Sequence, residues 1–124
     1  MVKESLKVSH AIFVGECGLD SLVKTDFSEQ IRVFEAQAHM AEECRKPLII
    51  HCVKVYNEVI GMHNRIQPKM PWIMHGYNGN LQTTKQMMTK SFLFSFGKIL
   101  FEPNSNAVES LQFLPIDRIF FETD

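Results

Sequence analysis

The chain has 124 residues, of which 45% are hydrophobic and 22% are charged, and its formal net charge is −1. This composition indicates one ordinary globular domain over residues 1–124, and it excludes a protein that binds nucleic acid through a strongly basic overall charge. Three cysteines without CxxC spacing argue against a disulfide scaffold and favour a reducing compartment. The charged start lacks a secretory signal, and no apolar run approaches the ~20 residues of a membrane helix. We therefore expect a cytoplasmic protein with no membrane partner.

Apolar runs of strand type alternate with amphipathic stretches along the whole chain. In chain order we predict a helix over 1–9, a strand over 11–16, a helix over 27–45, a strand over 47–51, a helix over 54–66, a strand over 71–75, a helix over 81–88, a strand over 92–96, a helix over 106–114 and a strand over 118–121. Asp26 and Glu29 resemble a capping box before the first long helix, and Asn80 is the expected N-cap of the short one. Val108 and Leu111 are expected on the inward face of the last helix.

Successive strands joined by helices predict an α/β fold with about five parallel strands. Two architectures satisfy this pattern, an open doubly wound sheet and part of a (β/α)8 barrel. With 124 residues the chain is too short for a complete barrel, which typically takes about 250 residues.

The predicted strands end on side chains that can bind a metal ion or transfer a proton. Glu16, His51 and His75 stand where three strands stop, and the last strand leads into 122–124 (ETD). Because the carboxyl ends of parallel strands meet at one edge of a sheet, we expect these side chains to lie together. A histidine at the end of an apolar strand needs partners, and metal ligation or base chemistry often supplies them. The alternative for Glu16 is a capping or salt-bridged acid.

Three lysines follow strand ends closely enough to meet a phosphate group. They are Lys24, Lys54 and Lys98. Lysines in loops are commonly solvated, so the alternative is that they have no role in binding.

Four short motifs occur in order and at suitable spacing. They are 15–20 (GECGLD), 46–51 (KPLIIH), 75–79 (HGYNG) and the pair 115–118 (PIDR) with 122–124 (ETD). Together with Gln30, Phe34 and the segment 94–97 (FSFG), they resemble the TatD family of metal-dependent DNases, which are amidohydrolase-like TIM barrels. The likeness covers the whole chain but only about the middle half of such a barrel. Residues 1–124 are thus expected to form a partial (β/α)8 barrel, a TatD-like hydrolase domain without its N-terminal strands and C-terminal end.

The resemblance implies a site with two divalent cations, Mg²⁺ first, with Mn²⁺ and Zn²⁺ as alternatives. Glu16 would bridge both ions, His51 and His75 would bind one of them, and Asp124 would bind the other beside the attacking water. Glu16 and Asp124 would thereby act in catalysis, and the implied reaction is hydrolysis of DNA phosphodiester bonds by a metal-activated water.

The chain departs from the family pattern in its first strands and after His51. The His-x-His pair of the first strand and a histidine of the second are absent, and Val53 and Lys54 replace the usual Arg-Asp pair. Three of the eight strands are also missing, so two sheet edges are open and self-association is one way to cover them. We expect the complete gene product to be a nuclease, and residues 1–124 alone to be inactive or nearly so. The alternatives are a related ester or amide hydrolase, such as an aminoacyl-tRNA deacylase, or a non-catalytic metal-binding remnant.

Overall fold

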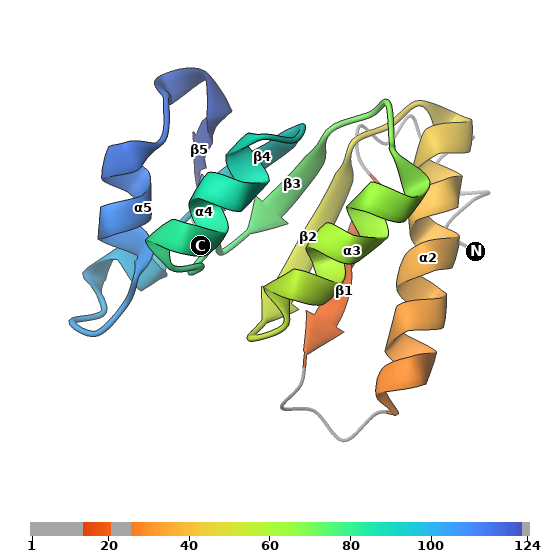
Figure 1. Ribbon diagram of the computed structural model, residues 1–124, viewed down its shortest axis with the longest axis horizontal. Coiled ribbons are helices and arrows are strands. Elements are labelled where there is room, and N and C mark those ends of the chain that lie inside the picture. Colours follow the sequence, from red (N-terminus) through yellow and green to blue (C-terminus); the bar gives the residue numbers. More distant parts are fainter. Residues whose placement is uncertain (1–13, 21–25, 123–124) are drawn as a thin grey trace.

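Five parallel strands form one sheet, and their order in space follows their order in the chain (Figure 1). The computed structural model describes the backbone of residues 14–20 and residues 26–122 in full, so the helix predicted over 1–9 lies outside the described part. The strands are β1 (Val14–Asp20), β2 (Leu48–Val53), β3 (Trp72–His75), β4 (Phe92–Phe96) and β5 (Ile119–Phe121). Every neighbouring pair is parallel, which requires a crossover connection between the two strands. The predicted α/β fold is confirmed.

Helices fill the crossovers and pack along one face of the sheet (Figure 1). They are α2 (Phe27–Cys44), α3 (Tyr56–Ile66), α4 (Leu81–Met88) and α5 (Ala107–Phe113), with two short 3₁₀ helices, η1 (Lys98–Phe101) and η2 (Ile116–Arg118). A doubly wound sheet carries helices on both faces, whereas a barrel carries them only on the outside. The arrangement is therefore that of a barrel segment. No helix in the described part of the chain is long and apolar enough to cross a membrane.

The side of the sheet that faces the helices carries the hydrophobic core. Alternate residues of the three central strands are buried there: Leu48, Ile50, Trp72, Met74, Phe92, Phe94 and Phe96. Phe34 of α2 packs against the ring of Trp72, with a centroid distance of 5.5 Å. Because successive strand residues point to opposite faces, the neighbours of Ile50 and Met74 point away from the helices. His51 and His75 are those neighbours, so they face the side that is the interior of a complete barrel.

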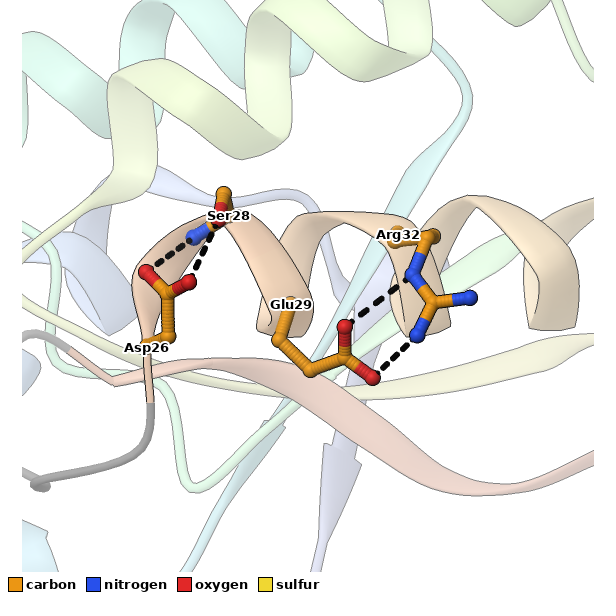
Figure 2. A network of polar contacts seen from close by, with 4 residues as sticks. All are labelled: Asp26, Ser28, Glu29 and Arg32. Atoms are coloured by element: carbon orange, nitrogen blue, oxygen red, sulfur yellow. Dashed lines mark hydrogen bonds and ion pairs between the residues drawn. The ribbon is translucent and has the colours of Figure 1, made fainter.

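Short-range polar contacts fix the first turn of α2 (Figure 2). The carboxylate of Asp26 accepts the backbone N–H of Ser28 at 3.3 Å and its hydroxyl at 2.8 Å, so the predicted N-cap is confirmed. Glu29, however, does not complete the predicted capping box. Its carboxylate pairs with both nitrogens on one edge of the Arg32 guanidinium, because a cation three residues ahead in a helix lies within its reach. The cap predicted for α4 is also confirmed, since the side chain of Asn80 accepts a backbone N–H in the first turn.

Helix α5 meets the core through part of the face that the sequence predicts, since Leu111 is partly buried and packs against the core. Val108, expected to point inward, is 44% exposed, whereas Ala107 and Ser110 are buried. The Ser110 hydroxyl lies 2.7 Å from that of Thr84 and donates to the carbonyl of Gly79 at 2.8 Å. These buried hydrogen bonds draw the small polar face of the helix inward, because a hydroxyl in the core must find partners.

Strand β1 is longer than predicted. The sequence predicts a strand that ends at Glu16, but β1 continues because residues 18–20 pair with 51–53 of β2. The register of this pairing shifts between Val14 and Cys17. Glu16 therefore lies at an irregularity inside the strand, and such bulges often occur beside functional sites.

Candidate functional site

Two histidines lie beside each other near the carboxyl ends of β2 and β3. The sequence predicts that β2 stops at His51, but the strand continues to Val53, because its last two residues pair with β1. His51 and His75 are direct partners in the parallel ladder, and their ring centroids are 6.4 Å apart. The side chain of His75 is 41% exposed, and His51 is also open to solvent. Two imidazoles on one ion have centroids about 5–6 Å apart when each nitrogen lies about 2 Å from the metal. The observed separation is slightly longer than this range.

A carboxylate from the end of β5 reaches this pair. Oε2 of Glu122 lies 2.9 Å from Nδ1 of His75 and accepts the backbone N–H of Gly76 at 2.6 Å. The side chain of Glu122 is only 15% exposed. The sequence analysis assigns a role to Asp124 but none to Glu122. An acid directly after a strand is nevertheless the same signal that singles out Glu16, and it could have found this residue.

The other two predicted ligands lie where the structure describes no side chain. Glu16 is placed only by its backbone in β1, and Asp124 lies outside the described residues. Within the part of the chain whose side chains are described, no group of three or more His, Cys, Asp or Glu is arranged to hold a metal ion. That part supplies two imidazole donors on one face. The donors fit a divalent ion only if oxygen ligands join them, which is the role that the resemblance assigns to Glu16 and Asp124.

A cleft with a volume of about 580 Å³ opens beside His51, between the ends of β2 and β3 and the start of α3. Much of its lining is polar and includes Lys54, Tyr56, Asn57, Asn78, Asn80 and Asn106. Amide, hydroxyl and ammonium groups of this kind are the ones that proteins use to contact phosphates, sugars and base edges. Glu58 also lines the cleft, so Lys54 is the group that would attract an anion there, and the cleft can hold a polar ligand next to His51.

Internal hydrogen bonds hold the walls of this cleft together. The hydroxyl of Tyr56 accepts the backbone N–H of Asn78 at 3.2 Å, and the side-chain oxygen of Asn78 accepts the backbone N–H of Asn106 at 2.9 Å. Burial raises the pKa of Tyr56 to about 12, so its hydroxyl stays protonated near neutral pH. The loop after β3 is thereby tied to both α3 and α5.

Of the three lysines that could meet phosphate, the structure describes Lys54 and Lys98. Lys54 is exposed, lines the cleft and has a left-handed backbone, with φ of 65°. Lys98 begins η1 after β4 and is exposed, but it does not line this cleft. Lys24 lies outside the described residues. The structure thus places one of the three beside His51.

A further histidine, His63, belongs to the core. Its ring packs against Trp72 and Phe92, with centroid distances of 5.0 and 4.6 Å, and Nε2 lies 3.2 Å from the hydroxyl of Ser91. Burial, together with the charge of Lys90, lowers the pKa of His63. His63 is therefore a structural histidine of the core.

Comparison with known families identifies the chain. A sequence model of the family described as TatD related DNase matches residues 1–124, the whole chain. The chain belongs to this family. The resemblance drawn from the four motifs is thereby confirmed.

Curated TatD relatives match nearly all of this chain but are longer. The human protein named 3'-5' RNA nuclease TATDN2 is 28% identical over 127 residues, which cover 98% of this chain and 17% of that protein. An uncharacterized metal-dependent hydrolase of Bacillus subtilis, YabD, is 29% identical over 126 residues, 99% of this chain and 49% of its own length. The 3'-5' ssDNA/RNA exonuclease TatD of Citrobacter koseri is 27% identical over 119 residues, 91% of this chain and 45% of its own. The chain thus spans about half, or less, of these relatives.

Solved TatD structures share the fold. The crystal structure of YJJV, a TatD homologue from Escherichia coli, matches with a TM-score of 0.88 and 22% identity, covering 99% of this chain and 49% of that chain. A TatD family hydrolase from Entamoeba histolytica matches with a TM-score of 0.81 and 17% identity, covering 97% and 41%. The chain is therefore a segment of a TatD barrel, as the sequence predicts.

Proposed function

We propose that the complete protein is a metal-dependent nuclease that hydrolyses phosphodiester bonds of DNA at the carboxyl ends of its barrel strands. The observation that carries the proposal is the pairing of His51 with His75 on the interior face, next to a polar cleft. The names of two relatives, an RNA nuclease and an ssDNA/RNA exonuclease, support nucleic acid as the substrate class. They support RNA as well as DNA, so the test includes both.

In this proposal His51, His75, Glu16 and Asp124 would together hold two divalent ions. Bound divalent ions polarise the phosphoryl group and lower the pKa of a water molecule. Imidazole donors suit Zn²⁺ and carboxylates suit Mg²⁺ and Mn²⁺, so the three ions are compared experimentally.

The chain's own side chains would bind and orient the nucleic acid. Lys54 would neutralise a phosphate at the mouth of the cleft, and the asparagine amides of the lining would hydrogen-bond to sugar and base. The protonated hydroxyl of Tyr56 keeps the wall of the cleft in place. The net reaction adds water across one P–O bond, which leaves a phosphate monoester on one fragment and a hydroxyl on the other.

The test uses the full-length gene product and single-stranded DNA and RNA oligonucleotides of one sequence, with Mg²⁺, Mn²⁺ or Zn²⁺ and with chelator. Cleavage should require metal, and His51→Ala and His75→Ala should each slow it by at least about 100-fold, because each removes a metal ligand. His39→Ala is the matched control, since that histidine is exposed on α2. Cleavage that survives both substitutions would overturn the proposal. Hydrolysis of aminoacyl or other small esters without nuclease activity would favour the related hydrolase instead, and cleavage of RNA alone would correct the substrate.

A further inference from the structure

Glu122 reaches across a whole strand to meet His75. Glu122 follows β5 and His75 ends β3, and β4 lies between these two strands in the sheet. Nevertheless, one oxygen of Glu122, Oε2, lies 2.9 Å from Nδ1 of His75 and accepts the backbone N–H of Gly76. The same oxygen thus holds the imidazole ring and the turn that follows it.

Gly97 leaves the space that Glu122 occupies. This glycine directly follows β4, and a Cβ added to it would lie 2.7 Å from Oε1 of Glu122 and 3.4 Å from its Cβ. The backbone of Glu122 is also anchored, because its N–H donates to the carbonyl of Phe96 at 2.7 Å. The backbone at position 122 is thus held, but the carboxylate is the end of a flexible side chain and is the group that can shift. A side chain at position 97 would therefore force it away from His75.

We infer that Glu122 is a positioning residue for His75, which acts on the imidazole and does not itself bind a metal ion. This inference rests on the proposed function, in which His75 is a metal ligand. A carboxylate that accepts a hydrogen bond from Nδ1–H holds the neutral ring in the tautomer whose lone pair is on Nε2. It fixes the orientation of the ring and makes Nε2 a stronger donor to a metal ion.

The contacts of the two carboxylate oxygens provide a way to separate positioning from ligation. Both protein donors meet Oε2, and Oε1 faces Gly97. Glutamine at position 122 keeps an oxygen that can accept from both donors but removes the negative charge, whereas alanine removes the acceptor. If Glu122 positions His75, Glu122→Gln should keep that role. If Glu122 were a metal ligand, Glu122→Gln should weaken metal binding. Glu122→Ala should abolish either role.

The first readout is the tautomer of His75 in metal-free protein, measured by long-range ¹H–¹⁵N correlation spectra. The wild type and Glu122→Gln should carry the proton on Nδ1. Glu122→Ala and Gly97→Ala should shift it toward Nε2, because the acceptor is removed in one and displaced in the other. Gly61→Ala is the matched control for Gly97→Ala, since an added Cβ at that helix position meets no atom within 4 Å.

The second readout is the dissociation constant of Zn²⁺ by calorimetry. Glu122→Ala and Gly97→Ala should weaken binding by about 10- to 100-fold, the usual effect of losing a residue that orients a metal ligand. Glu122→Gln keeps the hydrogen-bond acceptor without its charge, so it should lose clearly less affinity than Glu122→Ala, and Gly61→Ala should bind as tightly as the wild type.

Two results would overturn the role of Glu122. One is an unchanged His75 tautomer in Glu122→Ala, and the other is a loss of affinity in Glu122→Gln as large as in Glu122→Ala, which would make Glu122 a ligand. Failure of the proposed function looks different. In that case the wild type binds no Zn²⁺, Mn²⁺ or Mg²⁺ while its spectrum still shows the Nδ1 proton. That result would reject the proposed metal centre but retain the hydrogen bond between Glu122 and His75.

Discussion

Replacing Gly79 by alanine should destabilise the loop that forms one wall of the cleft. An added Cβ would lie 2.2 Å from Oη of Tyr77 and 2.6 Å from its Cζ. The tyrosine ring cannot move aside, since it is 1% exposed and packs against Phe94 and Tyr56, with centroid distances of 4.7 and 5.4 Å. Its hydroxyl is also bonded to Thr84 at 2.8 Å. The clash must therefore be relieved by distorting the loop or by breaking this hydrogen bond.

The expected loss is about 2–4 kcal/mol in the free energy of unfolding, from about 1–3 kcal/mol for overpacking and about 0.5–1.5 kcal/mol for the hydrogen bond. Urea unfolding measures it, followed by fluorescence of Trp72, the single tryptophan, and by circular dichroism. The matched control is Gly61→Ala in α3, where nothing lies within 4 Å of the added methyl. Alanine favours a helix over glycine by up to about 1 kcal/mol, so the control should be as stable as the wild type or more so.

A second variant tests the cause of the loss. Tyr77→Phe in the Gly79→Ala background removes the oxygen that makes the shortest contact. The double variant should therefore lose less stability than the sum of the losses in the two single variants. Stability of Gly79→Ala within about 0.5 kcal/mol of the wild type, the range of neutral surface changes, would refute the reasoning.

Three further predictions concern pH, a loop and the cleft. Burial lowers the pKa of His63 from 6.5, so below that pH the unfolded chain takes up a proton that the folded chain does not, and stability falls. His63→Gln should flatten this fall in urea titrations from neutral to acidic pH, and equal slopes would contradict it. Glu42 accepts two backbone N–H groups of the loop before β3, at 2.8 and 2.9 Å, and Glu42→Ala should cost about 1–3 kcal/mol by the same assay. A loss no larger than that of an exposed surface substitution would show that the loop does not depend on it. Lys54→Ala should weaken binding of single-stranded DNA and lower the dependence of log K on log[salt] by about one unit. Lys69→Ala, exposed before β3 at the opposite end of the sheet, should leave both unchanged, and equal effects would remove Lys54 from the cleft's function.

Elements fixed by local signals could be predicted from the sequence. The caps at Asp26 and Asn80 depend only on a side chain and the next few backbone groups, and both are present. The length of β1 could not be predicted from its own residues. The strand continues beyond Glu16 because it pairs with β2, and that pairing is visible only in the structure. The exposure of Val108 in α5 could not be predicted in this way, because it depends on Ser110 bonding to the hydroxyl of Thr84 and the carbonyl of Gly79 in a distant segment.

The candidate site shows the same division. His51 and His75 occupy equivalent places at the ends of neighbouring parallel strands, so their proximity follows from strand length and alternation alone. The role of Glu122 does not follow in this way. Its contact with His75 crosses β4 and uses the space that Gly97 leaves free, and a sequence pattern does not show which space between strands is free.

The central claim is that the two strand-end histidines form a metal centre, and metal content per chain tests it most directly. Elemental analysis would compare full-length wild type, His51→Ala and the control His39→Ala, purified without chelator and then supplied with Mg²⁺, Mn²⁺ or Zn²⁺. The account predicts bound metal in the wild type and in His39→Ala, with at least one ion lost in His51→Ala. Equal metal content in all three proteins, or none in the wild type, would contradict it.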